Sequence, residues 1–127
     1  MIKTLLAVAC LLPSVAFAEG VRIELNSLTT HDMSCRMVFT AQSEAGVEGL
    51  VLETALFDTS GAVILFTLFD FVDLPAGNLR VRQFDIAAQS CDAIGRVLFN
   101  VIDSCEGVGC AMPLSVNSRV ETVEVLG

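Results

Sequence analysis

Short runs of alternating hydrophobic and polar residues follow one another along the chain from residue 21 onward. In the first run Val21, Ile23 and Leu25 alternate with polar or charged neighbours, which is the two-residue period of a half-buried strand. Further runs cover residues 35–41, 50–57, 62–71, 79–86, 96–103 and 118–125. Turn-forming residues separate these runs, so the pattern predicts about seven strands at the spacing of a sandwich or barrel.

The run from residue 62 to 71 carries two specific predictions. Asp58-Thr59-Ser60-Gly61 precedes it, and this turn sequence predicts a hairpin with the run at 50–57. Residues Val63 to Phe69 are apolar on both faces of a strand. We therefore expect this strand in the interior of a sheet, because an exposed segment of this kind promotes aggregation.

Two later segments depart from simple alternation. Arginines and hydrophobic residues share one side of the run at 79–86, namely Arg80, Arg82, Phe84 and Ile86. A bulge or a change of phase near Gln83 is therefore expected. The segment Asp85–Ile94 contains three alanines but is short and interrupted by Ser90 and Cys91, so it predicts a loop or one helical turn.

The first 18 residues have the organisation of a cleaved signal peptide. Lys3 precedes an apolar stretch from Leu5 to Leu12, and Ala16-Phe17-Ala18 supplies the small residues that a signal peptidase recognises. The stretch is shorter than the roughly 20 apolar residues that span a bilayer. Cys10 lacks the leucine that usually precedes a lipidated cysteine, so a lipid anchor is the alternative. We expect residues 19–127 to form a single domain, periplasmic or secreted, with no transmembrane segment after cleavage.

Charge and aromatic content narrow the classes of partner. Residues 19–127 contain six arginines and fifteen acidic residues, which gives a formal charge of 6 − 15 = −9. Nucleic acid and anionic membrane surfaces require a basic surface, so neither is an expected partner. The chain has no tyrosine or tryptophan, and these are the aromatic types that usually stack on sugars or anchor interfaces. Carbohydrate binding is therefore disfavoured.

Several of these segments together carry a family resemblance. They are Phe39 in a strand, the run Leu50–Leu56, the turn Phe57-Asp58-x-x-Gly61, and Leu74-Pro75-Ala76-Gly77 before an arginine-rich strand. In these features the chain resembles the small extracytoplasmic FxLYD-type immunoglobulin-like domains, over most of residues 35–110. The whole chain is also similar to a group of uncharacterised small exported proteins of alphaproteobacteria, although it lacks their twin-arginine signal. The resemblance implies an all-β, immunoglobulin-like antiparallel β-sandwich, and it implies no activity.

Four cysteines follow the signal peptide, and an even number in a small exported domain predicts two disulfides. They are Cys35, Cys91, Cys105 and Cys110, and three connectivities are open. Glycines between Cys105 and Cys110 allow a tight loop, so Cys105–Cys110 with Cys35–Cys91 is the preferred pairing. A redox pair is the alternative, but four residues separate Cys105 from Cys110 where thioredoxin-like motifs have two.

The segment from His31 to Met37 is the most suggestive chemically. In extended backbone His31, Met33, Cys35 and Met37 project to one side, and imidazole and sulfur ligands suit copper(I). A disulfide at Cys35 removes the thiolate, and the chain contains no second histidine. The structural alternative places His31 in a loop and Met37 in the core, so we expect no tight copper or zinc site.

Catalytic motifs are absent from the sequence, and two pairs of acidic residues are the remaining candidates for catalysis. Asp70 with Asp73, or Asp92 with Asp103, could form the carboxylate pair of a hydrolase, but solvated turn acids are the ordinary case. We therefore expect no enzyme, with no catalytic, cofactor-binding or metal-binding residue and no cofactor. The leading hypothesis is a non-enzymatic module that contacts another exported protein through loops or a strand edge. Weak soft-metal binding and then a carboxylate-dependent hydrolase are the alternatives, and the oligomeric state is left open.

Overall fold

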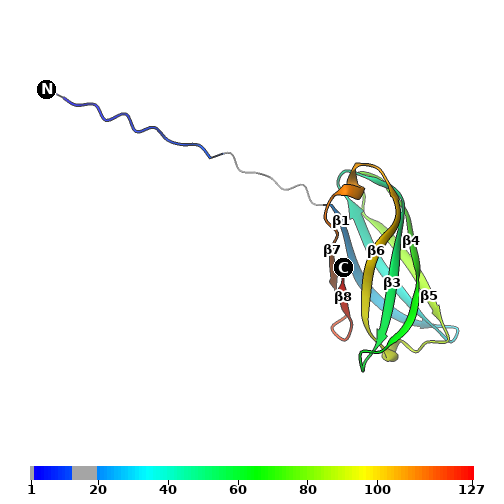
Figure 1. Ribbon diagram of the computed structural model, residues 1–127. Coiled ribbons are helices and arrows are strands. Elements are labelled where there is room, and N and C mark those ends of the chain that lie inside the picture. Colours follow the sequence, from blue (N-terminus) through cyan, green and yellow to red (C-terminus); the bar gives the residue numbers. More distant parts are fainter. Residues whose placement is uncertain (1, 13–19) are drawn as a thin grey trace.

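A computed structural model describes residues 2–12 and 20–127, and residues 20–127 fold into two packed β-sheets (Figure 1). The strands are β1 (Val21–His31), β2 (Ser34–Ser43), β3 (Val47–Asp58), β4 (Val63–Leu74), β5 (Arg80–Ala87), β6 (Ile94–Glu106), β7 (Ser115–Ser118) and β8 (Glu124–Leu126). Two short 3-10 turns, η1 (Cys91–Ala93) and η2 (Val108–Ala111), precede and follow β6. Sheet A has the strand order β5-β2-β1-β7, and sheet B has the order β4-β3-β6-β8. The expected β-sandwich is confirmed, with eight strands in the described chain.

Most strand pairings are antiparallel, as expected, but two are parallel. β1 pairs with β7 and β6 with β8 in parallel, whereas β1–β2, β2–β5, β3–β4 and β3–β6 are antiparallel. The hairpin expected at residues 58–61 joins β3 to β4, and the amide of Gly61 donates to the carbonyl oxygen of Asp58 at 3.1 Å. The segment expected as a loop or one helical turn contains the end of β5 and then η1.

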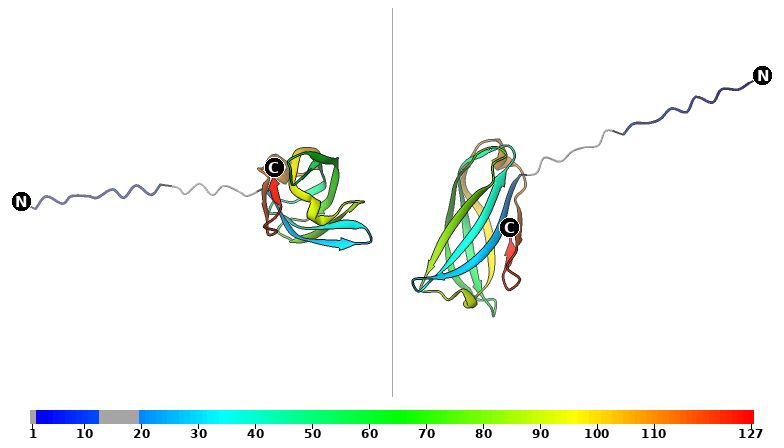
Figure 2. Two further views of the ribbon diagram at one scale, coloured as in Figure 1. Left: turned by 90° about the horizontal axis from the view of Figure 1, so that it is seen from below. Right: turned by 180° about the vertical axis from the view of Figure 1, so that it is seen from behind.

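Residues 2–12 form neither helix nor strand, and their side chains are exposed. Figures 1 and 2 show this segment extending away from the sandwich. The expected signal peptide covers residues 1–18, and its cleavage motif at 16–18 lies outside the described residues. No helix in residues 2–12 and 20–127 has the length and apolar character needed to cross a membrane.

The inward-facing residues of the two sheets form one apolar core. In β2 the alternation expected from the sequence is observed, and Met37 and Phe39 are fully buried. Phe39 lies at the centre of a phenylalanine cluster. Ring centroids of Phe69, Phe71, Phe84 and Phe99 lie 5.8 to 6.0 Å from its own. These tilted and edge-to-face arrangements are the favourable ones for aromatic pairs.

The single strand expected at residues 118–125 is wrong. The chain forms β7 in sheet A, turns, and then forms β8 in sheet B. In the turn the hydroxyl of Ser118 and the amide of Val123 both donate to the carbonyl oxygen of Val120, at 3.0 and 3.1 Å. Each short strand pairs with a different sheet, so the turn carries the chain from one layer to the other along one side of the sandwich (Figure 2).

The bulge expected near Gln83 is also wrong. β5 pairs with β2 without a register shift from Arg80 to Ala87. Arg82 shares the inward phase of the strand without entering the core. Its Nε donates to the carbonyl oxygen of Phe71 at 2.7 Å, and its Nη2 donates to that of Asp73 at 2.8 Å. The guanidinium therefore bridges the open side of the sandwich between β5 and the end of β4.

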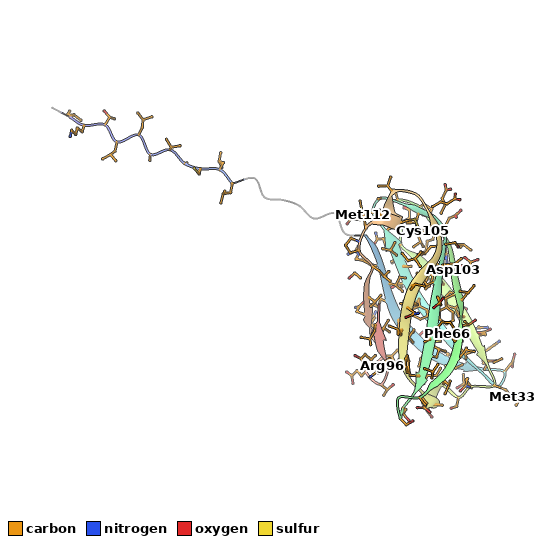
Figure 3. The ribbon with its side chains drawn as sticks, viewed as in Figure 1. Met33, Phe66, Arg96, Asp103, Cys105 and Met112 are labelled. Carbon is orange, nitrogen blue, oxygen red and sulfur yellow. A yellow bond between two sulfur atoms is a disulfide. The ribbon has the colours of Figure 1, made fainter. Side chains whose placement is uncertain are left out.

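Gly20 directly precedes β1 and packs against the segment before β7. A Cβ atom added at Gly20 would lie 2.1 Å from the carbonyl oxygen of Pro113 and 2.9 Å from the Cβ of Met112 (labelled in Figure 3). One close contact is with main chain, so the backbone must shift to admit a methyl group.

We therefore expect Gly20→Ala to lower the free energy of unfolding by about 1–3 kcal/mol, the usual cost of overpacking. Urea denaturation of residues 19–127 measures this change. A loss below about 0.5 kcal/mol, typical of surface substitutions, would show that the Met112–Pro113 segment gives way freely.

Candidate functional site

The outward-facing side of sheet A is polar. The strand register places Val81, Thr40, Glu24 and Asn117 in one row across its four strands. Asn117 donates to Glu24 at 2.7 Å. Arg36 donates twice to the carboxylate of Asp85, at 2.8 and 3.1 Å. This hydrogen bond lowers the pKa of Asp85 and raises that of Arg36. The polar groups of this face thus hydrogen-bond one another.

The outward-facing side of sheet B is apolar over half of its length. The register places Phe66, Ala55, Leu98 and Leu126 in one row across the four strands. The neighbouring row contains Val63 and Phe57, and the row on the other side contains Leu68 and Val101. We call the exposed or half-buried members of these rows the outer apolar patch: Phe57, Val63, Phe66, Leu68, Leu98, Val101 and Leu126.

Several side chains of the outer apolar patch are largely open to solvent. Phe66 is 59% exposed, Val63 57%, Leu68 52% and Val101 51%. Figure 3 shows Phe66 and Arg96 over this sheet. The patch is therefore a surface feature of the domain and not part of its core.

The polar groups bordering the outer apolar patch are paired. The guanidinium of Arg96 lies 5.6 Å from the ring centroid of Phe57, and its Nε donates to Glu124 at 3.0 Å. Glu53 accepts a hydrogen bond from the side chain of Asn100 at 2.8 Å. The guanidinium of Arg96 thus lies over the half-buried ring of Phe57, whereas Phe66, Val63, Leu68 and Val101 are more than half exposed.

The outer apolar patch continues to the edge of sheet B. β4 is the first strand of the order β4-β3-β6-β8, so the expectation that residues 63–69 lie in a sheet interior is wrong. The reason is topological, because the chain leaves β4 for β5 in the other sheet and no other described strand lies beside it. In the described part of the chain, residues 63–69 hydrogen-bond only with β3. The sequence signal for this site was that both faces of the strand are apolar. We interpreted that pattern as a sign of burial.

A groove separates the two edge strands β4 and β5. Its volume is about 420 Å³, and its lining includes Leu65, Thr67, Phe69, Phe84 and Ile86. The rings of Phe69 and Phe84 stack across the two sheets, with centroids 4.1 Å apart and planes 5° apart. The groove wall is therefore mainly apolar along β4, next to the free backbone edge of that strand, and carries Gln83 and Asp85 on the β5 side.

Two further hollows lie elsewhere on the sandwich. One, of about 710 Å³ on the outer face of sheet A, is lined by residues that include Arg22, Glu24, Gln42 and Arg119. The other, of about 520 Å³ at one end of the sandwich, is lined by three acidic residues together with hydrophobic residues such as Leu74 and Val108. In the first hollow, Arg22 donates to Gln42 at 2.9 Å and Glu24 accepts from Asn117 at 2.7 Å, so these groups already have partners within the fold.

The acidic residues considered for catalysis have structural contacts. Asp70 accepts the amide of Val72 at 2.8 Å, and Asp73 accepts the amide of Gly49 at 2.9 Å. Val72 and Gly49 have φ values of +51° and +57° where the pairing of β3 with β4 is irregular. These two carboxylates therefore hold a bulged region of sheet B.

Asp92 and Asp103 are not brought together. Asp92 lies in η1, before the first residue of β6, and Asp103 lies near the other end of that strand. Nine residues of extended backbone from Ile94 to Asp103 span about 30 Å. Figure 3 shows Asp103 in the upper half of the sandwich. The strand thus keeps these two carboxylates too far apart to act as a pair.

The residues of the candidate copper site are also divided by the fold. His31 ends β1, and Asp32 and Met33 form the turn to β2 with φ values of +45° and +62°. Met33 is 88% exposed, whereas Met37 is fully buried and Cys35 is disulfide-bonded. Among residues 2–12 and 20–127, no group of three or more His, Cys, Asp or Glu is placed to hold a metal ion.

The cysteine pairs are those favoured from the sequence. Cys35–Cys91 ties β2 to η1, and Cys105–Cys110 closes the turn between β6 and η2. Cys10 is a free, exposed cysteine in the segment 2–12. The first bridge joins residues far apart in sequence and the second closes a local loop.

The comparisons with known proteins add no relative. No protein-family model matches the chain, and neither a curated protein nor a solved structure is similar to it. Inferences about function therefore depend on the residues described above.

Proposed function

We propose that residues 19–127 form a non-enzymatic binding module that contacts another exported protein through the outer apolar patch and the edge of β4. The observation that carries this proposal is the contrast between the two outer faces. Sheet A presents paired polar groups, whereas sheet B presents four hydrophobic side chains that are more than half exposed. Contiguous exposed apolar surface of this kind marks interaction sites in proteins.

The proposed compartment is the bacterial periplasm or the exterior of the cell. Residues 1–18 have the pattern of a signal peptide. The two disulfides support the same compartment, because disulfides form and persist where the environment is oxidising. The engagement of Asp70 and Asp73 with backbone amides supports a non-enzymatic role.

The test is mild chemical cross-linking of the protein in its native bacterium, followed by identification of the partner that co-purifies. Phe66→Glu is expected to abolish capture of the partner found with the wild-type protein, because it places a charge in the outer apolar patch. Val81→Glu is the matched control, since Val81 is 54% exposed on the outer face of sheet A. Equal capture by both variants would contradict the proposal.

A further inference from the structure

We propose that the edge of β4 binds an extended segment of the partner as a fifth strand of sheet B, and that this segment carries basic residues flanking an uncharged apolar stretch. This inference rests on the proposed function and specifies how the partner is held. It would be a case of β-strand addition, in which backbone hydrogen bonds supply affinity and alternate side chains supply specificity.

The backbone of β4 is open where other edges are protected. Natural edge strands carry charged residues or bulges that discourage pairing. β5, the edge of sheet A, carries Arg80, Arg82 and Asp85 within eight residues. The end of β4 is protected by Asp70, by the irregular pairing at Val72, and by the guanidinium of Arg82 on two carbonyl oxygens.

Residues 65–69 of β4 lack these devices in the described structure. Val63-Ile64-Leu65-Phe66-Thr67-Leu68-Phe69 contains no charge, proline or glycine, but the pairing with β3 shifts register between Leu65 and Val63, which leaves Ile64 as an extra residue. The five regularly paired residues from Leu65 to Phe69 span about 17 Å, which is the length of an ordinary strand. The unprotected length therefore begins after Ile64 and ends where the protection by Asp70 and Arg82 begins.

The surroundings of this edge determine the side chains that an added strand would carry. Alternate side chains of a strand point to opposite faces. One set would enter the groove beside Leu65, Phe69 and Phe84, and the other set would extend the outer apolar patch beside Phe66 and Leu68. The side chains of β4 on both surfaces are mainly apolar, and Gln83 and Asp85 line only the β5 side of the groove, so the partner segment is expected to be mainly apolar on both faces.

The charges near the ends of the edge are acidic. Asp58 precedes the hairpin and Asp70 follows residue 69. The hydroxyl of Ser60 and the amide of Ala62 hydrogen-bond to Asp58 and lower the pKa of its carboxyl group, so it is ionised at neutral pH. Arg82, the basic side chain near the Asp70 end of β4, is engaged with the carbonyl oxygens of Phe71 and Asp73. Lysine or arginine on each side of the apolar stretch would complement these carboxylates and the net charge of −9 on residues 19–127.

The same charges disfavour a second copy of this chain as the occupant. A symmetric antiparallel pairing of two β4 strands centred on Phe66 would place Asp70 of each copy beside Ala62 of the other, with Asp58 of that copy close by. Like charges facing each other across strands are destabilising. A different, basic chain is therefore the better fit.

The test is binding of a synthetic peptide to purified residues 19–127. The probe has a central stretch of valine, isoleucine and threonine between two pairs of arginines and is blocked at both ends. Leu68→Lys should weaken its binding by about tenfold or more, because lysine on an edge opposes strand pairing. Val81→Lys is the matched control, since Val81 lies on the outer face of sheet A, outside the outer apolar patch, is 54% exposed and adds the same charge. Val81→Lys should change the affinity by less than about twofold.

Two further measurements complete the test. A probe with glutamates in place of the arginines should bind at least about tenfold more weakly, and the arginine probe should slow hydrogen exchange of the amides in residues 65–69. Equal weakening by Leu68→Lys and Val81→Lys would overturn strand addition, because the added charge alone would account for the loss of binding. A wild-type dimer dispersed by Leu68→Lys, without peptide binding, would identify a second copy as the occupant and overturn the inference. Loss of the native partner in Phe66→Glu tests the proposed function separately.

Discussion

Replacing Phe39 by alanine is expected to lower the free energy of unfolding by about 3–5 kcal/mol, the cost of removing a large buried aromatic side chain. Phe39 is fully buried, and its ring contacts phenylalanines from three other strands of the core. Contacts with Phe69 and Phe71 join it to β4, and contact with Phe99 joins it to β6. The cavity left by the substitution would therefore lie between the two sheets, where neither sheet closes it without moving.

The measurement is urea denaturation of residues 19–127, monitored by circular dichroism. Intrinsic fluorescence is not suitable, because the chain has no tryptophan or tyrosine. Phe66→Ala is the control, since Phe66 is 59% exposed on the outer apolar patch. We expect this control to lose less than about 1 kcal/mol. Similar losses for the two variants would contradict the position of Phe39 at the centre of the core.

Removing the Cys35–Cys91 disulfide with a double alanine substitution is expected to lower the free energy of unfolding by about 4 kcal/mol. The bridge joins residues 56 positions apart, so it restricts a long loop in the unfolded chain. The Cys105–Cys110 bridge joins residues 5 positions apart, and its removal is expected to cost about 2 kcal/mol by the same loop-entropy argument.

Both double variants are measured by the same denaturation experiment. Peptide mapping under non-reducing conditions verifies that the other disulfide is intact in each variant. Each variant serves as the control for the other, because each removes two cysteines. A larger loss for the Cys105 and Cys110 variant would contradict the loop-entropy argument. It would indicate instead that the packing of η2 against the end of the sandwich dominates.

The outer apolar patch lies away from the features that stabilise the fold. The phenylalanine cluster and the long disulfide lie between the sheets or at η1, so the outer face of sheet B is free to vary without loss of the core. Substitutions there are therefore expected to act on binding rather than on folding. Phe66→Glu and Leu68→Lys are informative for this reason.

Local sequence predicted the first six strands and the hairpin between the third and the fourth. Alternation at residues 21–25 and 35–41 reports which side chains face the core, because successive residues of a strand point to opposite faces. The turn at 58–61 and the tight loop between Cys105 and Cys110 likewise depend on residues that are neighbours in sequence. Closure of the short loop leaves Cys35 and Cys91 as the remaining pair after residue 18, so the sequence favoured this pairing among the three that were open.

Tertiary structure alone decided which strands lie at the edges and what their outer faces meet. The continuous apolar pattern of Val63 to Phe69 is the same whether β4 lies inside a sheet or at its edge, because a strand's own sequence does not state how many neighbours pair with it. In the sequence, Arg82 interrupts the hydrophobic pattern of its strand. Only the fold explains its position, because β4 provides the carbonyl oxygens to which it donates. The segment 118–125 divides because its two halves find partners in different sheets. The proposed site depends on such non-local pairings, in which residues far apart in sequence set each other's exposure, and so only the folded chain reveals it.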